Sequence, residues 1–100
     1  MNVQIQTVHF DADSKLIEHV QQKIEKLKTF HDQIISVEVY LVLDNLAHQI
    51  RDKIVEIRVN VPRHSYFVKQ SSKAFEESFS MAFNSMANQL KRRKEKGLPV

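Results

Sequence analysis

The 100-residue sequence contains no cysteine, no tryptophan, one glycine and two prolines. Without cysteine there is no disulfide, thiolate metal site or thiol nucleophile, which fits a reducing compartment. Because the single glycine is Gly97, the chain has no glycine-rich phosphate-binding loop. The scarcity of glycine and proline also predicts few, short loops, so most of the chain should be helix and strand.

Long apolar runs are missing as well. No stretch approaches the roughly 18 apolar residues that a membrane-spanning helix needs. The first ten residues, MNVQIQTVHF, alternate polar and apolar side chains and lack the basic start and apolar run of a secretory signal. Hydrophobic residues at 42% and charged residues at 27% are typical of a soluble globular protein. We therefore expect a cytoplasmic protein whose residues 1–100 form one domain.

Metal-binding and catalytic patterns are also missing. No two of the five histidines lie three or four residues apart, as paired zinc ligands on a helix would. No serine sits in a glycine-flanked nucleophile elbow. Asp11 and Asp13 form a carboxylate pair, but they stand where the N-terminus of a helix favours capping and negative charge. We expect no enzyme activity, cofactor, metal or small-molecule substrate.

Hydrophobic periodicity predicts four strands and two helices. Period-2 alternation indicates strands, and apolar residues at three- and four-residue spacing indicate helices. The second helix should be capped by Ser71 or Ser72, and a short turn should occupy 63–65. The predicted elements are strand 2–9, helix 14–30, strand 37–43, strand 54–61, strand 66–70 and a helix that runs to about Lys96.

The order β-α-β-β-β-α predicts an α+β fold similar to a double-stranded-RNA-binding domain. Both helices have one apolar stripe and three strands have a polar face, so both helices should pack on one face of a four-stranded sheet. The last three strands are consecutive and should be antiparallel. We expect Tyr40 and either Tyr66 or Phe67 on the open face, and Phe10 or Phe30 at the rim of the helices.

Positive charge is concentrated at the C-terminal end. Residues 1–90 contain 10 Lys/Arg and 11 Asp/Glu, a net charge of −1, whereas 91–100 contain five Lys/Arg and one Glu, a net charge of +4. A helix dipole favours one or two cations at this end, by about 0.3–1 kcal/mol each. Five cations within six residues repel each other, which favours an anionic polymer as partner.

The first helix has a basic flank beside its apolar stripe. A helical wheel places Lys15, His19, Lys23 and Lys26 on this flank, away from the acidic side chains of the same helix. A solvated face could segregate its charges in this way by chance. If the two helices are neighbours, however, their cations form one basic surface. A surface of this width indicates a nucleic acid, and RNA would be recognised through phosphates and 2′-hydroxyls.

The element order, the length and the ending Gln89-Leu90-Lys91-Arg92-Arg93-Lys94 resemble the ribosome hibernation-promoting factor family, also called ribosome-associated inhibitor A or sigma-54 modulation proteins. The resemblance implies binding to small-subunit rRNA in the channel that holds mRNA and tRNA. It also implies inhibition of translation and protection of idle ribosomes in stationary phase or stress. The implied RNA contacts are Lys23, Lys26, Lys28, Lys91, Arg92, Arg93, Lys94 and Lys96.

The chain departs from the family pattern at three places. Residues 74–80 replace an Asp-x-Tyr-x-Ala-Ile-Asp run, and Pro62-Arg63-His64 replaces a turn that commonly contains glycine. The sequence given has no C-terminal dimerisation domain, so the resemblance implies a short form that depends on other hibernation factors for ribosome dimers. The alternative function is a protein-interaction module that uses its open sheet face or edge, with the basic tail only aiding solubility.

Overall fold

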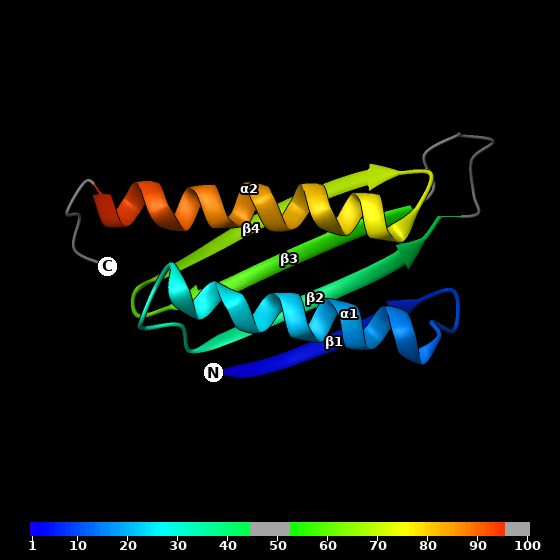
Figure 1. Ribbon diagram of the computed structural model, residues 1–100, viewed down its shortest axis with the longest axis horizontal. Helices are drawn as coiled ribbons and strands as arrows, with labels where there is room; N and C mark the ends of the chain where they lie inside the picture. The colour runs from blue at the N-terminus through cyan, green and yellow to red at the C-terminus, as the bar shows by residue number, and fades with distance from the viewer. Residues whose placement is uncertain (45–52, 96–100) are drawn as a thin grey trace.

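The computed structural model describes residues 1–44 and 53–95, with side chains described as far as Arg92. The predicted element order is confirmed (Figure 1). Lys96, where the last helix was expected to end, lies outside the described residues. The elements are β1 Asn2–Val8, α1 Ser14–Glu25, the 3-10 helix η1 Lys26–Thr29, β2 Ser36–Leu43, β3 Lys53–Val61, β4 His64–Ser72 and α2 Phe75–Glu95.

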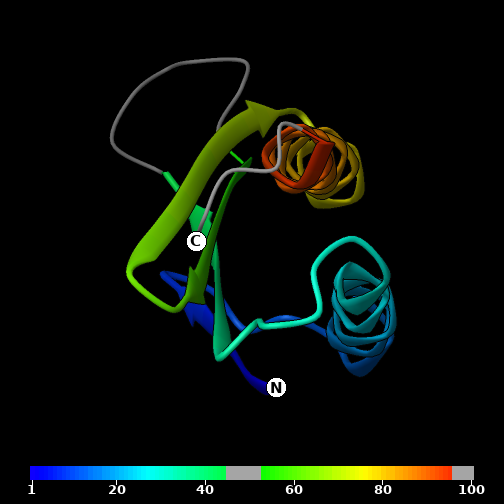
Figure 2. The same cartoon turned by 90° about the vertical axis from the view of Figure 1, so that its left-hand side faces the viewer.

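The four strands form one sheet in the order β1-β2-β3-β4. The predicted antiparallel pairing of β2 with β3 and of β3 with β4 is confirmed. β1 pairs in parallel with β2, because α1 carries the chain back between them. As predicted, both helices pack on one face of the sheet, and no described helix covers the other face (Figure 2).

The two helices run in the same direction (Figure 1). This follows from the topology, since α1 returns from β1, α2 returns from β4, and β1 and β4 point the same way. The C-terminal ends of both helices therefore lie at one end of the molecule. The negative ends of both helix dipoles meet there, which favours cations at that end.

The core lies between the sheet and the helices. The strands supply alternating residues and the helices supply their predicted apolar stripes. Burying a side chain of this size stabilises the fold by about 1.5–3 kcal/mol. The largest fully buried side chains are Val20, Ile24, Leu27, Val37, Val39, Leu41, Val55, Ile57, Val59, Phe79, Met86 and Leu90.

The first helix begins as predicted but changes form near its end. Asp13 is the N-cap, and its Oδ1 accepts a hydrogen bond of 2.8 Å from the backbone N–H of Leu16. The segment predicted as one helix over 14–30 tightens into the 3-10 helix η1 after Glu25. β1 ends one residue before its predicted end, because His9 takes a left-handed conformation with φ 70°.

The β3–β4 turn is tighter than predicted. The turn was expected at 63–65, but β4 already begins at His64, so Pro62 and Arg63 alone connect the strands. Arg63 has φ 67°. Proline followed by a residue with positive φ is the pattern of a type II turn, whose third position normally favours glycine. The predicted turn was wrong because arginine carries no sequence signal for this conformation.

The predicted cap of the second helix was also wrong. The first helical hydrogen bond runs 3.0 Å from the N–H of Ser78 to the carbonyl of Ala74, so α2 begins at Phe75, three residues after Ser72. Ser72 instead serves a buried network. Ser78 Oγ donates to the Lys53 carbonyl at 2.6 Å, and the two serine hydroxyls lie 2.7 Å apart. This network joins β3, the end of β4 and the first turns of α2.

Candidate nucleic-acid interface

The basic flank of α1 faces α2. The His19 ring lies edge-on to Phe79 of α2, with 5.9 Å between ring centroids. One turn later, Lys23 Nζ lies 5.8 Å from the ring centroid of Phe83, also on α2. Two of the four side chains that the helical wheel placed beside the apolar stripe, His19 and Lys23, therefore lie on the side of α1 that meets its neighbour.

Lys91 makes the corresponding contact from α2. Its Nζ lies 4.6 Å from the ring centroid of Phe30, which follows η1. Such a cation–π contact at an exposed site contributes about 0.5–1 kcal/mol. The expectation that the two helices are neighbours is confirmed, and their cations lie close enough to form one surface.

Lys28 is the one α1-side cation with an ion pair among the described residues. Its Nζ lies 3.0 Å from Glu25 Oε2, and the two side chains are 58% and 46% exposed. A pair this exposed contributes about 1 kcal/mol or less to stability. The positive field of Lys28 is nevertheless weakened by a neighbouring negative charge, which distinguishes it from the other lysines of the flank.

The predicted residues of known side-chain position are all exposed on the helix layer. Lys26, Lys28, Lys91 and Arg92 gather near the C-terminal ends of the helices, whereas Lys15 stands in the first turn of α1. We call Lys15, His19, Lys23, Lys26, Lys28, Lys91 and Arg92 the basic face. The backbones of Arg93 and Lys94 belong to α2, but their side chains, like all of Lys96, lie outside the described part.

The aromatic predictions are resolved by the packing. Tyr66 is buried, so Phe67 is the residue that shares the open sheet face with half-buried Tyr40. Phe10 is stacked on Phe75, with ring centroids 4.6 Å apart, and Phe30 lies beneath Lys91. Phe30 therefore contributes to the basic face as the support of a cation, a role that the sequence did not reveal.

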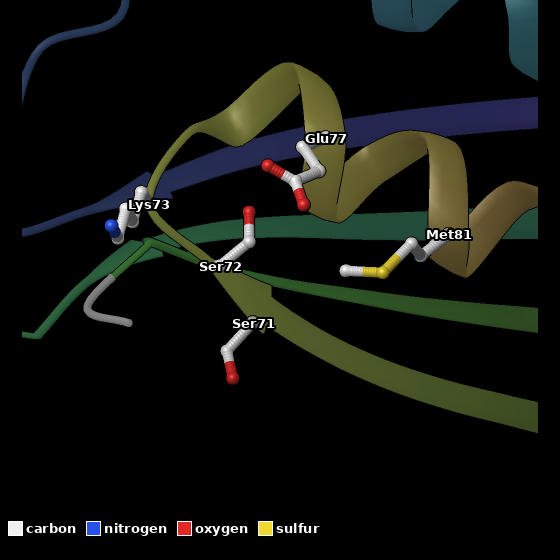
Figure 3. Close-up of a pocket in the computed structure, with 5 residues that line it drawn as sticks. All are labelled: Ser71, Ser72, Lys73, Glu77 and Met81. Carbon is white, nitrogen blue, oxygen red and sulfur yellow. The ribbon is translucent and has the colours of Figure 1, made fainter. Parts of the chain in front are cut away.

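A hollow at the start of α2 has a volume of about 330 Å³ and contains polar side chains (Figure 3). Glu77 and Ser72 face each other across it, while Lys73 and Ser71 point away. The hydroxyl of Ser72 is already bonded to Ala74 and Ser78. Among the described residues that line the hollow, neither serine hydroxyl is hydrogen-bonded to a side chain that could act as a base. Within residues 1–44 and 53–95, no group of three His, Asp or Glu could hold a metal ion.

The described helices include none that is both long and apolar enough to cross a membrane.

Comparison with known proteins identifies the family. A ribosomal subunit interface protein from Coxiella burnetii has a TM-score of 0.82 and 18% identity, over 95% of this chain and 99% of that one. The N-terminal domain of Protein Y from Thermus thermophilus has a TM-score of 0.78 and 19% identity, over 92% and 98%. No curated protein matched in the sequence search. Residues 3–97 match the family model described as sigma 54 modulation protein / S30EA ribosomal protein, and the chain belongs to this family.

Proposed function

We propose that this protein binds the small ribosomal subunit through rRNA at its basic face. The bound protein would occupy the channel of mRNA and tRNA, inhibit translation and protect idle ribosomes during stationary phase or stress. The observation that carries the proposal is the convergence of cations from α1 and α2 on one side of the molecule, joined by the Lys91–Phe30 and Lys23–Phe83 contacts. Family membership and a structural neighbour named as a ribosomal subunit interface protein support it.

The chemistry of this binding is electrostatic. Each lysine or arginine that meets a phosphate releases counterions, so affinity should fall steeply with salt. The helix layer offers no described catalytic group, and the proposed action is steric occupation of the channel without an enzymatic step. We propose the same RNA-binding role for Arg93, Lys94 and Lys96. Residues 1–100 would act as one cytoplasmic ribosome-binding domain.

A matched pair of variants tests the proposal. K91Q/R92Q removes two cations from the basic face, whereas K69Q/K73Q removes two exposed cations from the end of β4 and the start of α2. Both variants change the net charge from +3 to +1. We expect K91Q/R92Q to lose co-sedimentation with small subunits at moderate salt and K69Q/K73Q to retain it. Equal binding by both variants, or a wild-type protein that stays off ribosomes at low salt, would refute the proposal.

The alternative function, a protein-interaction module, is favoured by one feature, the 46% exposed Phe67 on the open sheet face. Nuclease treatment separates the two functions. A protein that stays off ribosomes but keeps a partner after complete digestion of RNA would support the module, whereas ribosome association that is lost on digestion would support rRNA binding.

A further inference from the structure

The open face of the sheet has its own hollow, on the side opposite the helices. The hollow has a volume of about 410 Å³. Val8 and Val42 contribute apolar surface, and Tyr40, two residues before Val42 on β2, stands opposite Glu56 of β3. Its remaining lining consists of Glu38, Glu56, Arg58 and Phe67. This face therefore combines aromatic rings with two carboxylates, a composition unlike that of the basic face.

Arg58, the one cation among the described residues that line the hollow, is already engaged. Arg58 stands directly opposite Glu38 in the β2–β3 register, but these side chains form no ion pair. The Arg58 guanidinium instead lies over Phe67, with Cζ 5.5 Å from the ring centroid. Glu38 receives a hydrogen bond of 3.3 Å from the side chain of Asn60. Arg58 therefore forms no ion pair with either carboxylate of the hollow, and neither carboxylate has a cationic partner among the described residues.

Glu56 is the less satisfied carboxylate. It is half-buried beside Tyr40, its neighbour across the β2–β3 ladder. Lys69 is its neighbour on β4 but forms no ion pair with it. Glu56 makes no hydrogen bond or salt bridge with any described residue. A half-buried carboxylate without a partner is costly, and a cation supplied from outside would compensate for it.

We propose that this open face binds an extended, arginine- and lysine-rich segment of a protein partner. A cationic side chain of the segment would lie over the Tyr40 ring between Glu38 and Glu56, and a second guanidinium would stack on the exposed Arg58–Phe67 pair. Aromatic faces attract cations, and the two carboxylates provide the complementary charge. The same carboxylates repel phosphate, which disfavours RNA on this face. Because the basic face lies on the opposite layer, both partners can be bound at once.

Fluorescence anisotropy with a labelled peptide of alternating arginine and serine tests this site without ribosomes. The test pair is E38Q/E56Q and the matched control E18Q/E25Q, which removes the same charge from exposed positions of α1. At low ionic strength we expect the dissociation constant to rise about tenfold in E38Q/E56Q and at most about twofold in E18Q/E25Q. Equal affinity in the two variants would overturn the proposal.

Two further measurements locate the site. With the same peptide, backbone amide shifts in nuclear magnetic resonance should change at Gln4, Tyr40 and Phe67 and leave Lys91 unaffected; changes confined to the helices would contradict the proposal. Y40L keeps the apolar contact and should weaken peptide binding several-fold, because the ring is lost. A labelled single-stranded RNA provides the opposite outcome. If the RNA displaces the peptide from the wild-type protein and binds more weakly to Y40L, the open face binds nucleobases, and the peptide site is overturned. These outcomes are independent of ribosome binding.

Discussion

Lys91 Nζ lies 4.6 Å from the ring centroid of Phe30, so a cation of α2 rests on an aromatic ring at the end of the α1 segment. The reverse contact joins Lys23 of α1 to Phe83 of α2 at 5.8 Å. Each helix segment thus holds one ammonium group of the other. Long lysine side chains lose rotamer freedom when they bind a phosphate. Phe30 and Phe83 already restrict the side chains of Lys91 and Lys23, so less rotamer freedom is lost on binding. The two rings should therefore hold these ammonium groups in position for RNA.

F30L should therefore weaken ribosome binding while all charges remain. Loss of one exposed cation–π contact corresponds to about 0.5–1 kcal/mol, or about a two- to fivefold lower affinity. The slope of log affinity against log salt should stay unchanged, because the number of phosphate contacts is the same. F10L is the control, since Phe10 packs on Phe75 and lies against no cation of the described residues. A shallower salt slope in F30L, or equal weakening in F10L, would contradict this role.

E25Q should strengthen ribosome binding. The substitution removes a negative charge beside the basic face and releases Lys28 from its 3.0 Å ion pair. E18Q removes the same charge from another exposed position of α1, where no ion pair is formed with a described residue. We expect the affinity gain in E25Q to exceed that in E18Q, by about twofold for an exposed pair. Titration of labelled protein with purified small subunits at several salt concentrations measures both effects. Equal gains would show that Lys28 does not contact RNA.

Much of the fold could be predicted because hydrophobic period determines which face is buried. Val37, Val39 and Leu41 alternate along β2, and all three are fully buried in the sheet. In the same way, the helical wheel placed Lys23 beside the apolar stripe of α1, and Lys23 lies on the side of α1 that contacts α2. The family model supports the same fold over residues 3–97.

Other features depend on tertiary geometry that a linear pattern does not contain. The contact of Lys91 with Phe30 joins residues 61 positions apart in sequence, and only the parallel course of the two helices brings them together. Arg58 forms no ion pair with Glu38, which stands opposite it on β2, and its guanidinium lies over Phe67 of β4 instead. The left-handed conformation of Arg63 could not be predicted from the sequence, because arginine does not favour that conformation.

Within a strand, a glycine variant is normally less stable than an alanine variant, and we expect the opposite order of stability at Arg63. A non-glycine residue in the left-handed region is disfavoured by roughly 1–2 kcal/mol, and Arg63 has φ 67°. R63G should therefore be more stable than R63A by about 1 kcal/mol, after the higher entropy of unfolded glycine is included. Lys69, an exposed residue inside β4, provides the control. There K69G should be less stable than K69A by about 0.5–1 kcal/mol. Urea unfolding measures both pairs, and R63A more stable than R63G would contradict the turn conformation.

S78A should destabilise the fold although it removes a single oxygen atom. Ser78 is fully buried, and its hydroxyl donates to the Lys53 carbonyl at 2.6 Å and contacts Ser72 Oγ at 2.7 Å. Each serine hydroxyl has one proton. Ser78 donates its proton to the Lys53 carbonyl, and the Ser72 hydroxyl lies within hydrogen-bond distance of both the Ala74 carbonyl and Ser78 Oγ. The loss of a buried hydrogen-bond donor costs about 1–3 kcal/mol.

S80A changes an exposed serine of the same helix and should shift stability by about 0.5 kcal/mol or less. The difference should appear as a lower urea midpoint with an unchanged slope, since both variants bury the same surface. A midpoint for S78A equal to that of S80A would show that the network contributes nothing to the junction of β3, β4 and α2.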